Sequence, residues 1–179
     1  DIYCGQVKSS FGPNDIIGIP PGFGTENLIL TSQDIMDYTI RFQNTGNDTA
    51  FNIHIIDTLD QKLDYLTFQF LGASHSCIPY MNGNGILDFR LYDINLPDSN
   101  TNESLSHGFI KFRIKPNNNL SQNDIITNQA FIYFDFNTPV ATNIVSTSLI
   151  NSFDDHTVND NSISLFPNPS NGNFKIAFN

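Results

Sequence analysis

Two cysteines and a nearby histidine are the first residues whose chemistry the sequence offers. Cys4 and Cys77 are the only cysteines, and an even number would favour a disulfide if the chain is exported to an oxidising compartment. A bond between them would close a loop of about 70 residues and stabilise the fold by about 4 kcal/mol; two separate thiols are the alternative. His75 lies two residues before Cys77. No glycine-rich elbow surrounds this pair, and zinc needs four ligands, so we expect neither a nucleophile nor a zinc site.

Calcium is the second chemistry that these residue types could supply, because hard cations prefer oxygen ligands. Three acids, Asp57, Asp60 and Asp64, lie in one connection, and a second segment places an acid and an amide two residues apart. Such residues also serve turns and caps. We therefore predict no firm metal site and no cofactor, with calcium as the alternative. The calcium candidates are Asp57, Asp60, Asp135 and Asn137.

Glycoside hydrolysis would need two carboxylic acids that face one another across a cleft. The chain has 18 acidic residues, so some pair of carboxylic acids can always be chosen, and their number does not indicate a glycosidase site. Glu26 and Glu103 are the only glutamates, both in loop-like sequence, and no tryptophan is present to stack a sugar ring. We predict that the chain is not an enzyme and has no catalytic residue.

Charge limits the classes of partner. The 18 acidic and 8 basic side chains give the 179-residue chain a formal net charge of −10, so it lacks the positive field that attracts nucleic acid or anionic lipid. No apolar run approaches the roughly 18 residues of a membrane-spanning helix. We expect no nucleic-acid partner and no membrane insertion. The first residues also lack a signal-peptide pattern, and we expect that any export signal was removed or lies upstream.

The elements that would position these residues are strands, because short β-branched and aromatic runs recur about every ten residues between Asn, Gly, Asp and Pro. The clearest is 37–44, where Tyr38, Ile40 and Phe42 share one face. Residues 108–115 alternate in the same way. The other predicted strands are 50–58, 65–71, 75–80, 86–94, 125–136 and 144–150.

Strand 50–58 would place Phe51, Ile53 and Ile55 inward, and its closeness to strand 37–44 predicts an antiparallel pair of the two. Seven or eight strands indicate an immunoglobulin- or fibronectin III-like antiparallel β-sandwich. We expect five phenylalanines to be packing residues rather than a binding stripe: Phe42, Phe51, Phe89, Phe112 and Phe131.

The sequence divides into four parts. Residues 1–24 form a lead-in whose proline- and glycine-rich segment 11–24 suits an entry loop or an edge. Residues 25–150 form the sandwich, and the polar, acidic residues 151–162 form a linker. Residues 163–179 look like the first hairpin of a second small β domain. Such a hairpin is not stable alone, so it must dock, be disordered or continue in a longer chain.

Seven motifs follow one another along residues 12–150: 38–46, 48–52, 56–60, 73–75, 94–98, 106–109 and 128–143. Together they resemble the immunoglobulin-like module found near the C-termini of large secreted Bacteroidota proteins. Such modules usually open with an acidic-Pro-Asn-Asp-Lys sequence, whereas Gly12-Pro-Asn-Asp-Ile16 lacks both the acid and the lysine. An intramolecular crosslink through that lysine is therefore not expected here.

The segment 162–178, SISLFPNPSNGNFKIAF, is similar to the start of the type A C-terminal sorting domain of the type IX secretion system. Full sorting domains of that family continue for several more strands. The resemblance implies that the outer-membrane translocon and its shuttle proteins recognise this tail. The residues expected to carry recognition are Ile163, Leu165, Phe166, Pro167, Asn168, Pro169, Gly172 and Phe174.

These resemblances predict a non-enzymatic module of a protein that is exported across the outer membrane and lies at the cell surface or outside the cell. The alternative is a calcium- or carbohydrate-binding accessory module of a larger secreted hydrolase or adhesin. A third hypothesis is a self-associating subunit of a surface filament, since edge strands and a loose tail favour strand exchange.

Overall fold

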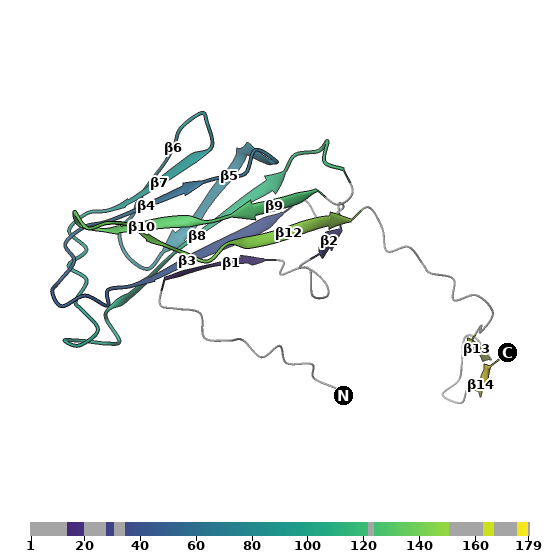
Figure 1. Cartoon of the computed structure of the whole chain (residues 1–179). Coiled ribbons are helices and arrows are strands. Elements are labelled where there is room, and N and C mark those ends of the chain that lie inside the picture. The colour runs from purple at the N-terminus through teal and green to yellow at the C-terminus, as the bar shows by residue number, and fades with distance from the viewer. Residues whose placement is uncertain are drawn as a thin grey trace.

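The computed structural model describes residues 14–19, 28–30, 35–121, 124–150, 163–166 and 175–178. These residues form fourteen strands and no helix (Figure 1). Within this part of the chain, no helix could span a membrane. The all-β prediction is confirmed.

Two sheets make up the sandwich (Figure 1). The four-stranded sheet has the order β1 (Asp15–Ile19), β3 (Met36–Gln43), β8 (His107–Pro116) and β5 (Leu63–Ala73). The five-stranded sheet has the order β11 (Val140–Ala141), β10 (Ala130–Phe134), β4 (Ile53–Thr58), β7 (Ile86–Leu91) and β6 (Ile78–Met81). Every neighbouring pair in both sheets is antiparallel.

A third, small sheet has β12 (Val145–Ile150) at its centre, with β2 (Leu28–Leu30) parallel to it and β9 (Ile125–Asn128) antiparallel. The tail forms a separate antiparallel hairpin of β13 (Ile163–Phe166) and β14 (Lys175–Phe178). The sequence-based expectation of two short strands in the tail is confirmed.

The core lies between the two large sheets. The rings of Phe89 on β7 and Phe112 on β8 have centroids 5.8 Å apart, which joins the five-stranded to the four-stranded sheet. Phe68 on β5 contacts both rings. The predicted inward residues of 37–44 are all buried, as are Ile110, Phe112 and Ile114 of β8. Alternation with a period of two therefore identified the buried faces correctly.

The predicted pairing of strands 37–44 and 50–58 is wrong. β3 pairs with β1 and β8, whereas β4 pairs with β7 and β10, so the chain between them crosses from one sheet to the other. The crossing is held by the buried Asn44, whose side-chain amide donates to the backbone oxygens of Asp48 (2.8 Å) and Leu96 (3.0 Å). Phe51 lies in this crossing and is 53% exposed, so its inward placement was also wrong.

The predicted strand 125–136 is two strands in different sheets. β9 ends at Asn128 and β10 begins at Ala130, so the chain changes sheets around Gln129. The predicted packing role is confirmed for Phe42, Phe89 and Phe112, but Phe131 is 39% exposed on β10. At the other end of the chain, β1 pairs only with β3 and forms an edge of the sheet within the predicted lead-in.

Candidate functional site

Asp57, the last inward residue of β4, is an acid buried inside the sandwich. Its side chain has no solvent exposure. One oxygen, Oδ2, accepts a hydrogen bond from Nδ2 of the buried Asn128 at 3.0 Å, and Oδ1 has no partner within the described chain. Burial raises the pKa of Asp57 to about 7, and the Asn128 hydrogen bond opposes that shift. Burial, and then the nearby Asp57, also raises the pKa of the Tyr38 hydroxyl.

Two of the other calcium candidates, Asp60 and Asp135, use their carboxylate oxygens as acceptors for backbone N–H groups. Asp60 accepts from the backbone nitrogens of Lys62 and Thr127, each at 3.0 Å. Asp135, in a left-handed conformation with φ of 50°, accepts from the backbone nitrogens of Phe51 (3.1 Å) and Asn52 (2.7 Å). These carboxylates therefore hold turns.

The four candidates also lie in two places. Asp57 faces Ala130 at one end of the β4–β10 pair, and Asp135 follows the other end of β10. Among the described residues, no group of three or more His, Cys, Asp or Glu side chains is arranged to hold a metal ion. The structure does not bring the calcium candidates together.

Replacing Asp135 with alanine is expected to destabilise the fold by about 1–3 kcal/mol, because two backbone N–H groups lose their acceptor and alanine disfavours positive φ. Urea unfolding would measure this loss, with Asn137→Ala as the control. Calcium and a chelator should leave the unfolding midpoint of the original chain unchanged. A rise in that midpoint with calcium, absent from the Asp135 variant, would instead establish a calcium site.

Cys77 and His75 lie in the connection between β5 and β6, not on a strand as predicted. Burial raises the pKa of the Cys77 thiol to about 11, which keeps it protonated and a poor nucleophile at neutral pH. Burial also lowers the pKa of His75, whose Nδ1 lies 2.8 Å from Oγ of Ser74. Cys4 lies outside the described residues, so the possible disulfide between Cys4 and Cys77 lies outside them as well.

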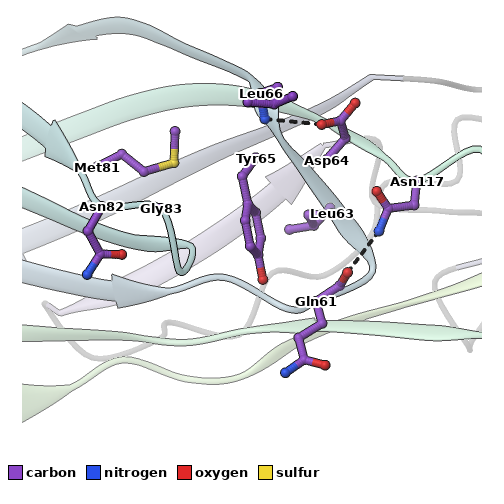
Figure 2. Close-up of a pocket in the computed structure, with 9 residues that line it drawn as sticks. All are labelled: Gln61, Leu63, Asp64, Tyr65, Leu66, Met81, Asn82, Gly83 and Asn117. Carbon is purple, nitrogen blue, oxygen red and sulfur yellow. Dashed lines mark hydrogen bonds between the residues drawn. The ribbon is translucent and has the colours of Figure 1, made fainter.

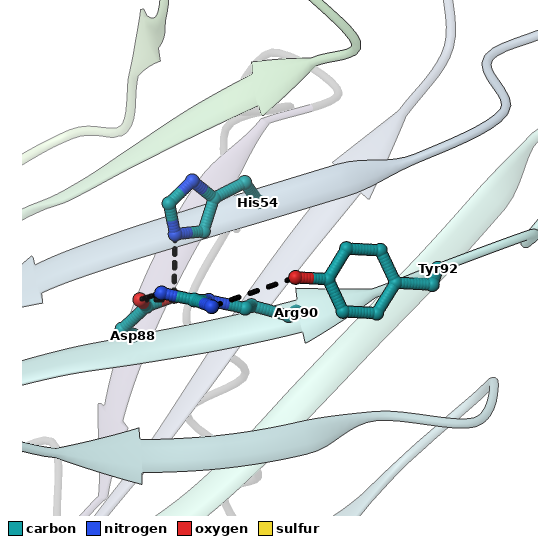
Figure 3. A network of polar contacts seen from close by, with 4 residues as sticks. All are labelled: His54, Asp88, Arg90 and Tyr92. Atoms are coloured by element: carbon teal, nitrogen blue, oxygen red, sulfur yellow. Dashed lines mark hydrogen bonds and ion pairs between the residues drawn. The ribbon is translucent and has the colours of Figure 1, made fainter.

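A polar network crosses the outer face of the five-stranded sheet (Figure 3). Asp88 on β7 accepts hydrogen bonds from Nε (2.9 Å) and Nη2 (2.7 Å) of Arg90, and its other oxygen contacts His54 Nε2 on β4. Burial favours a higher pKa for Asp88, but the Arg90 and His54 contacts outweigh it and hold the pKa below its usual value. Tyr92 lies 3.5 Å from Arg90.

Aromatic and aliphatic side chains flank this network. Residues directly opposite one another on paired strands share a face, and the register places Ile78 and Tyr80 of β6 opposite Arg90 and Asp88. Both are 59% exposed. The outer face of the four-stranded sheet carries an ion pair too, with Arg113 bound to Asp37 through two bonds of 2.6 and 2.8 Å.

A groove lies between the start of β5 and the turn that joins β6 to β7, and we call it the β5 groove (Figure 2). Its volume is about 540 Å³, which is within the range of ligand pockets. It is lined by Gln61, Leu63, Asp64, Tyr65, Leu66, Met81, Asn82, Gly83 and Asn117.

Residues 12–148 match the model of a protein family described as a domain of unknown function, DUF7619. The chain belongs to the DUF7619 family. The matched residues nearly coincide with the segment 12–150 that carries the sequence motifs, and they include both large sheets. No curated protein matches the sequence.

Solved structures with a similar fold come from bacterial surface proteins. The DUF7619 chain resembles the N-terminal domain of the Streptococcus gordonii adhesin Sgo0707, with a TM-score of 0.54, 15% identity and coverage of 78% of this chain and 33% of that one. Domains D2 and D3 of the Corynebacterium diphtheriae major pilin SpaD give a TM-score of 0.54 at 16% identity, with coverage of 75% of this chain and 52% of that one. The Bacillus cereus major pilin subunit BcpA gives a TM-score of 0.51 at 11% identity, with coverage of 76% of this chain and 39% of that one.

At these identities the likeness concerns the fold alone, and it supports the predicted immunoglobulin-like sandwich. The chain spans between a third and about half of the length of the chains in these solved structures. Of the predicted sorting residues, Ile163, Leu165 and Phe166 lie on β13. Pro167, Asn168, Pro169, Gly172 and Phe174 lie outside the described residues.

Sequence reasoning missed both surface features of the DUF7619 domain. The residues of the polar network, His54, Asp88 and Arg90, all lie on predicted strands, but only the pairing of β4 with β7 shows that they meet. The β5 groove combines a strand start, a turn and Asn117 from the segment after β8. No short sequence pattern contains these parts together.

Proposed function

We propose that this chain is a non-enzymatic module of a secreted or cell-surface protein exported by the type IX secretion system. The observation that carries the proposal is the segment 162–178, whose sequence is similar to the start of a type A sorting domain. Two strands form within it, with Ile163 opposite Phe178 and Phe166 opposite Lys175. The tail then acts as the signal, and the sandwich is the exported module.

The fold favours a structural role for the sandwich. Its relatives in fold are parts of an adhesin and of pilins. Among the described residues, the acids and the thiol that a hydrolase could use are unsuited to catalysis. Asp57 is buried beside Asn128, Asp135 holds a turn, and the raised pKa of the Cys77 thiol keeps it protonated. A surface module needs stability and accessible loops rather than an activated nucleophile.

The tail suits recognition through strand addition. A two-stranded hairpin has an unpaired backbone edge on each strand, and such edges can pair with a strand of another protein. Among the described residues, β13 pairs with β14 alone. Recognition by the translocon or its shuttle would then involve the edge of β13 together with the turn that follows it.

Capture from an outer-membrane extract of a type IX-secreting bacterium tests the proposal. We expect the chain ending at Asn179 to co-purify translocon or shuttle proteins, and Leu165→Asp to lose them, because a charge is placed in the centre of β13. Leu105→Asp is the matched control, since Leu105 is exposed on the sandwich. Equal capture by all three chains, or no such partner with the original chain, would overturn the proposal.

A further inference from the structure

The hydrogen-bonding groups of the β5 groove are mainly neutral amides (Figure 2). Asn82 Oδ1 accepts from the backbone nitrogens of Asn84 (3.0 Å) and Ile86 (3.1 Å), which leaves its NH₂ group for a ligand. Asn117 Nδ2 donates to the backbone oxygen of Gln61 at 2.8 Å, which leaves its oxygen as an acceptor. The Gln61 side-chain amide has no partner among the described residues. The groove therefore offers both donors and acceptors.

Several of these groups, but not the Gln61 amide, are held in place before any ligand arrives. The two amides are fixed by bonds to backbone, as described, and Asp64 Oδ1 accepts from the backbone nitrogen of Leu66 at 3.1 Å. Tyr65 is fixed as well, because its ring packs against Gly85, where an added Cβ would lie 2.3 Å from the ring. A preorganised site loses little conformational entropy on binding.

Apolar side chains provide the remaining surface of the groove. Tyr65 stands between the β6–β7 turn and the Asn117 side (Figure 2), with Met81 on one side and Leu66, which is 96% exposed, at the rim. An aromatic ring beside amide groups suits a ligand with apolar C–H faces and hydroxyl edges. Pyranose rings have that character.

Charge disfavours anionic ligands. Among the described residues, no lysine or arginine lines the groove, Asp64 contributes a carboxylate, and the chain has a net charge of −10. A phosphate, sulfate or carboxylate would lack a cationic partner and would be repelled. Hydroxyl groups both donate and accept hydrogen bonds, so they match the mixture of groups present.

We propose that the β5 groove binds a neutral saccharide chain. The proposal rests on the proposed function in one respect, since a surface module meets glycans outside the cell. Asn82 would donate to a sugar hydroxyl, Asn117 would accept from one, and the Tyr65 ring would contact the apolar face of a pyranose.

Titration of the full chain with neutral hexasaccharides tests this site, using β-1,3-glucan, β-1,4-glucan, mannan and galactan, with oligogalacturonate as the anionic comparison. NMR would follow the side-chain amide signals of Gln61, Asn82 and Asn117. We expect at least one neutral probe at millimolar concentration to shift these signals, and the anionic probe to leave them in place. No shift with any neutral probe would overturn the proposal.

Two variants separate direct binding from a structural effect. Gln61→Ala removes a side-chain amide that has no hydrogen-bond partner in the described part of the chain, and Asn82→Asp keeps the oxygen that holds the turn while it removes the NH₂ donor. Each is expected to weaken binding about fivefold. Asn47→Ala, an exposed amide outside the groove, is the matched control. Unchanged affinity in both groove variants would refute the site; because the tail is intact in all of them, export is tested separately.

Discussion

Replacing Asp57 with asparagine is expected to stabilise the domain at pH 8 by up to about 4 kcal/mol. The usual pKa of an aspartate is 3.8, and burial raises that of Asp57 to about 7. Between these values the folded state keeps a proton that the unfolded chain has released, so stability falls as the pH rises through this window. Asparagine stays neutral and can still accept the hydrogen bond from Asn128, so the penalty should vanish.

The difference in the free energy of unfolding between the Asp57→Asn variant and the original chain separates the titration of Asp57 from that of other groups. Asp37 and Asp88 have lowered pKa values, the first through its hydrogen bond to Arg113, and their contributions to stability are lost as the pH falls. Both are unchanged in the variant and cancel. Urea unfolding from pH 4 to pH 8 would measure the difference, with Asp48→Asn, an exposed acid, as control. A pH-independent difference between the two chains would contradict the raised pKa.

The sequence contained the signal for this buried acid. Ile53, Ile55 and Asp57 are two residues apart on one predicted strand, so they share a face, and that face is the core. Asp57 belongs both to the predicted strand 50–58 and to the predicted connection with Asp60 and Asp64. In the structure it lies on the strand, because β4 continues to Thr58, one residue beyond the acid.

Burial could be predicted from sequence because it depends on local alternation. In β3 and β8, each residue's face follows from its neighbours along the strand, so Tyr38 and Phe112 were assigned correctly. Strand pairing depends instead on distant segments: β3 pairs with β8 from Met36–Ile114 to Gln43–His107, across a long stretch of chain. The sequence of β3 or of β8 alone does not identify the strand with which it pairs.

The site was harder to predict than the fold for the same reason. The carboxylates chosen for their chemistry, such as Asp60 and Asp135, hold backbone N–H groups that only the folded chain brings near them. The groove amides were overlooked because an asparagine-rich sequence contains many equivalent candidates. Asn82 becomes distinctive only when the β6–β7 turn lies beside the start of β5.

Truncation of Phe112 to alanine is expected to cost about 3–5 kcal/mol. Its ring is fully buried and lies 5.3 Å from Tyr38, 5.9 Å from Phe68 and 5.8 Å from Phe89, measured between ring centroids. These three rings belong to β3, β5 and β7, so one side chain links three other strands across both sheets. Alanine would leave a cavity in the centre of the sandwich that rigid sheets cannot close.

Phe131→Ala is the matched control, because the same atoms are removed from a ring that is 39% exposed on the outer face of β10. Its loss should be clearly smaller, since less apolar surface returns to water and no internal cavity forms. Both variants can be compared by urea unfolding, in which a shifted midpoint at an unchanged slope of the transition reports a change in stability. Equal losses would mean that the outer face of the five-stranded sheet is covered, because only a covered ring would stabilise the fold as much as a core ring.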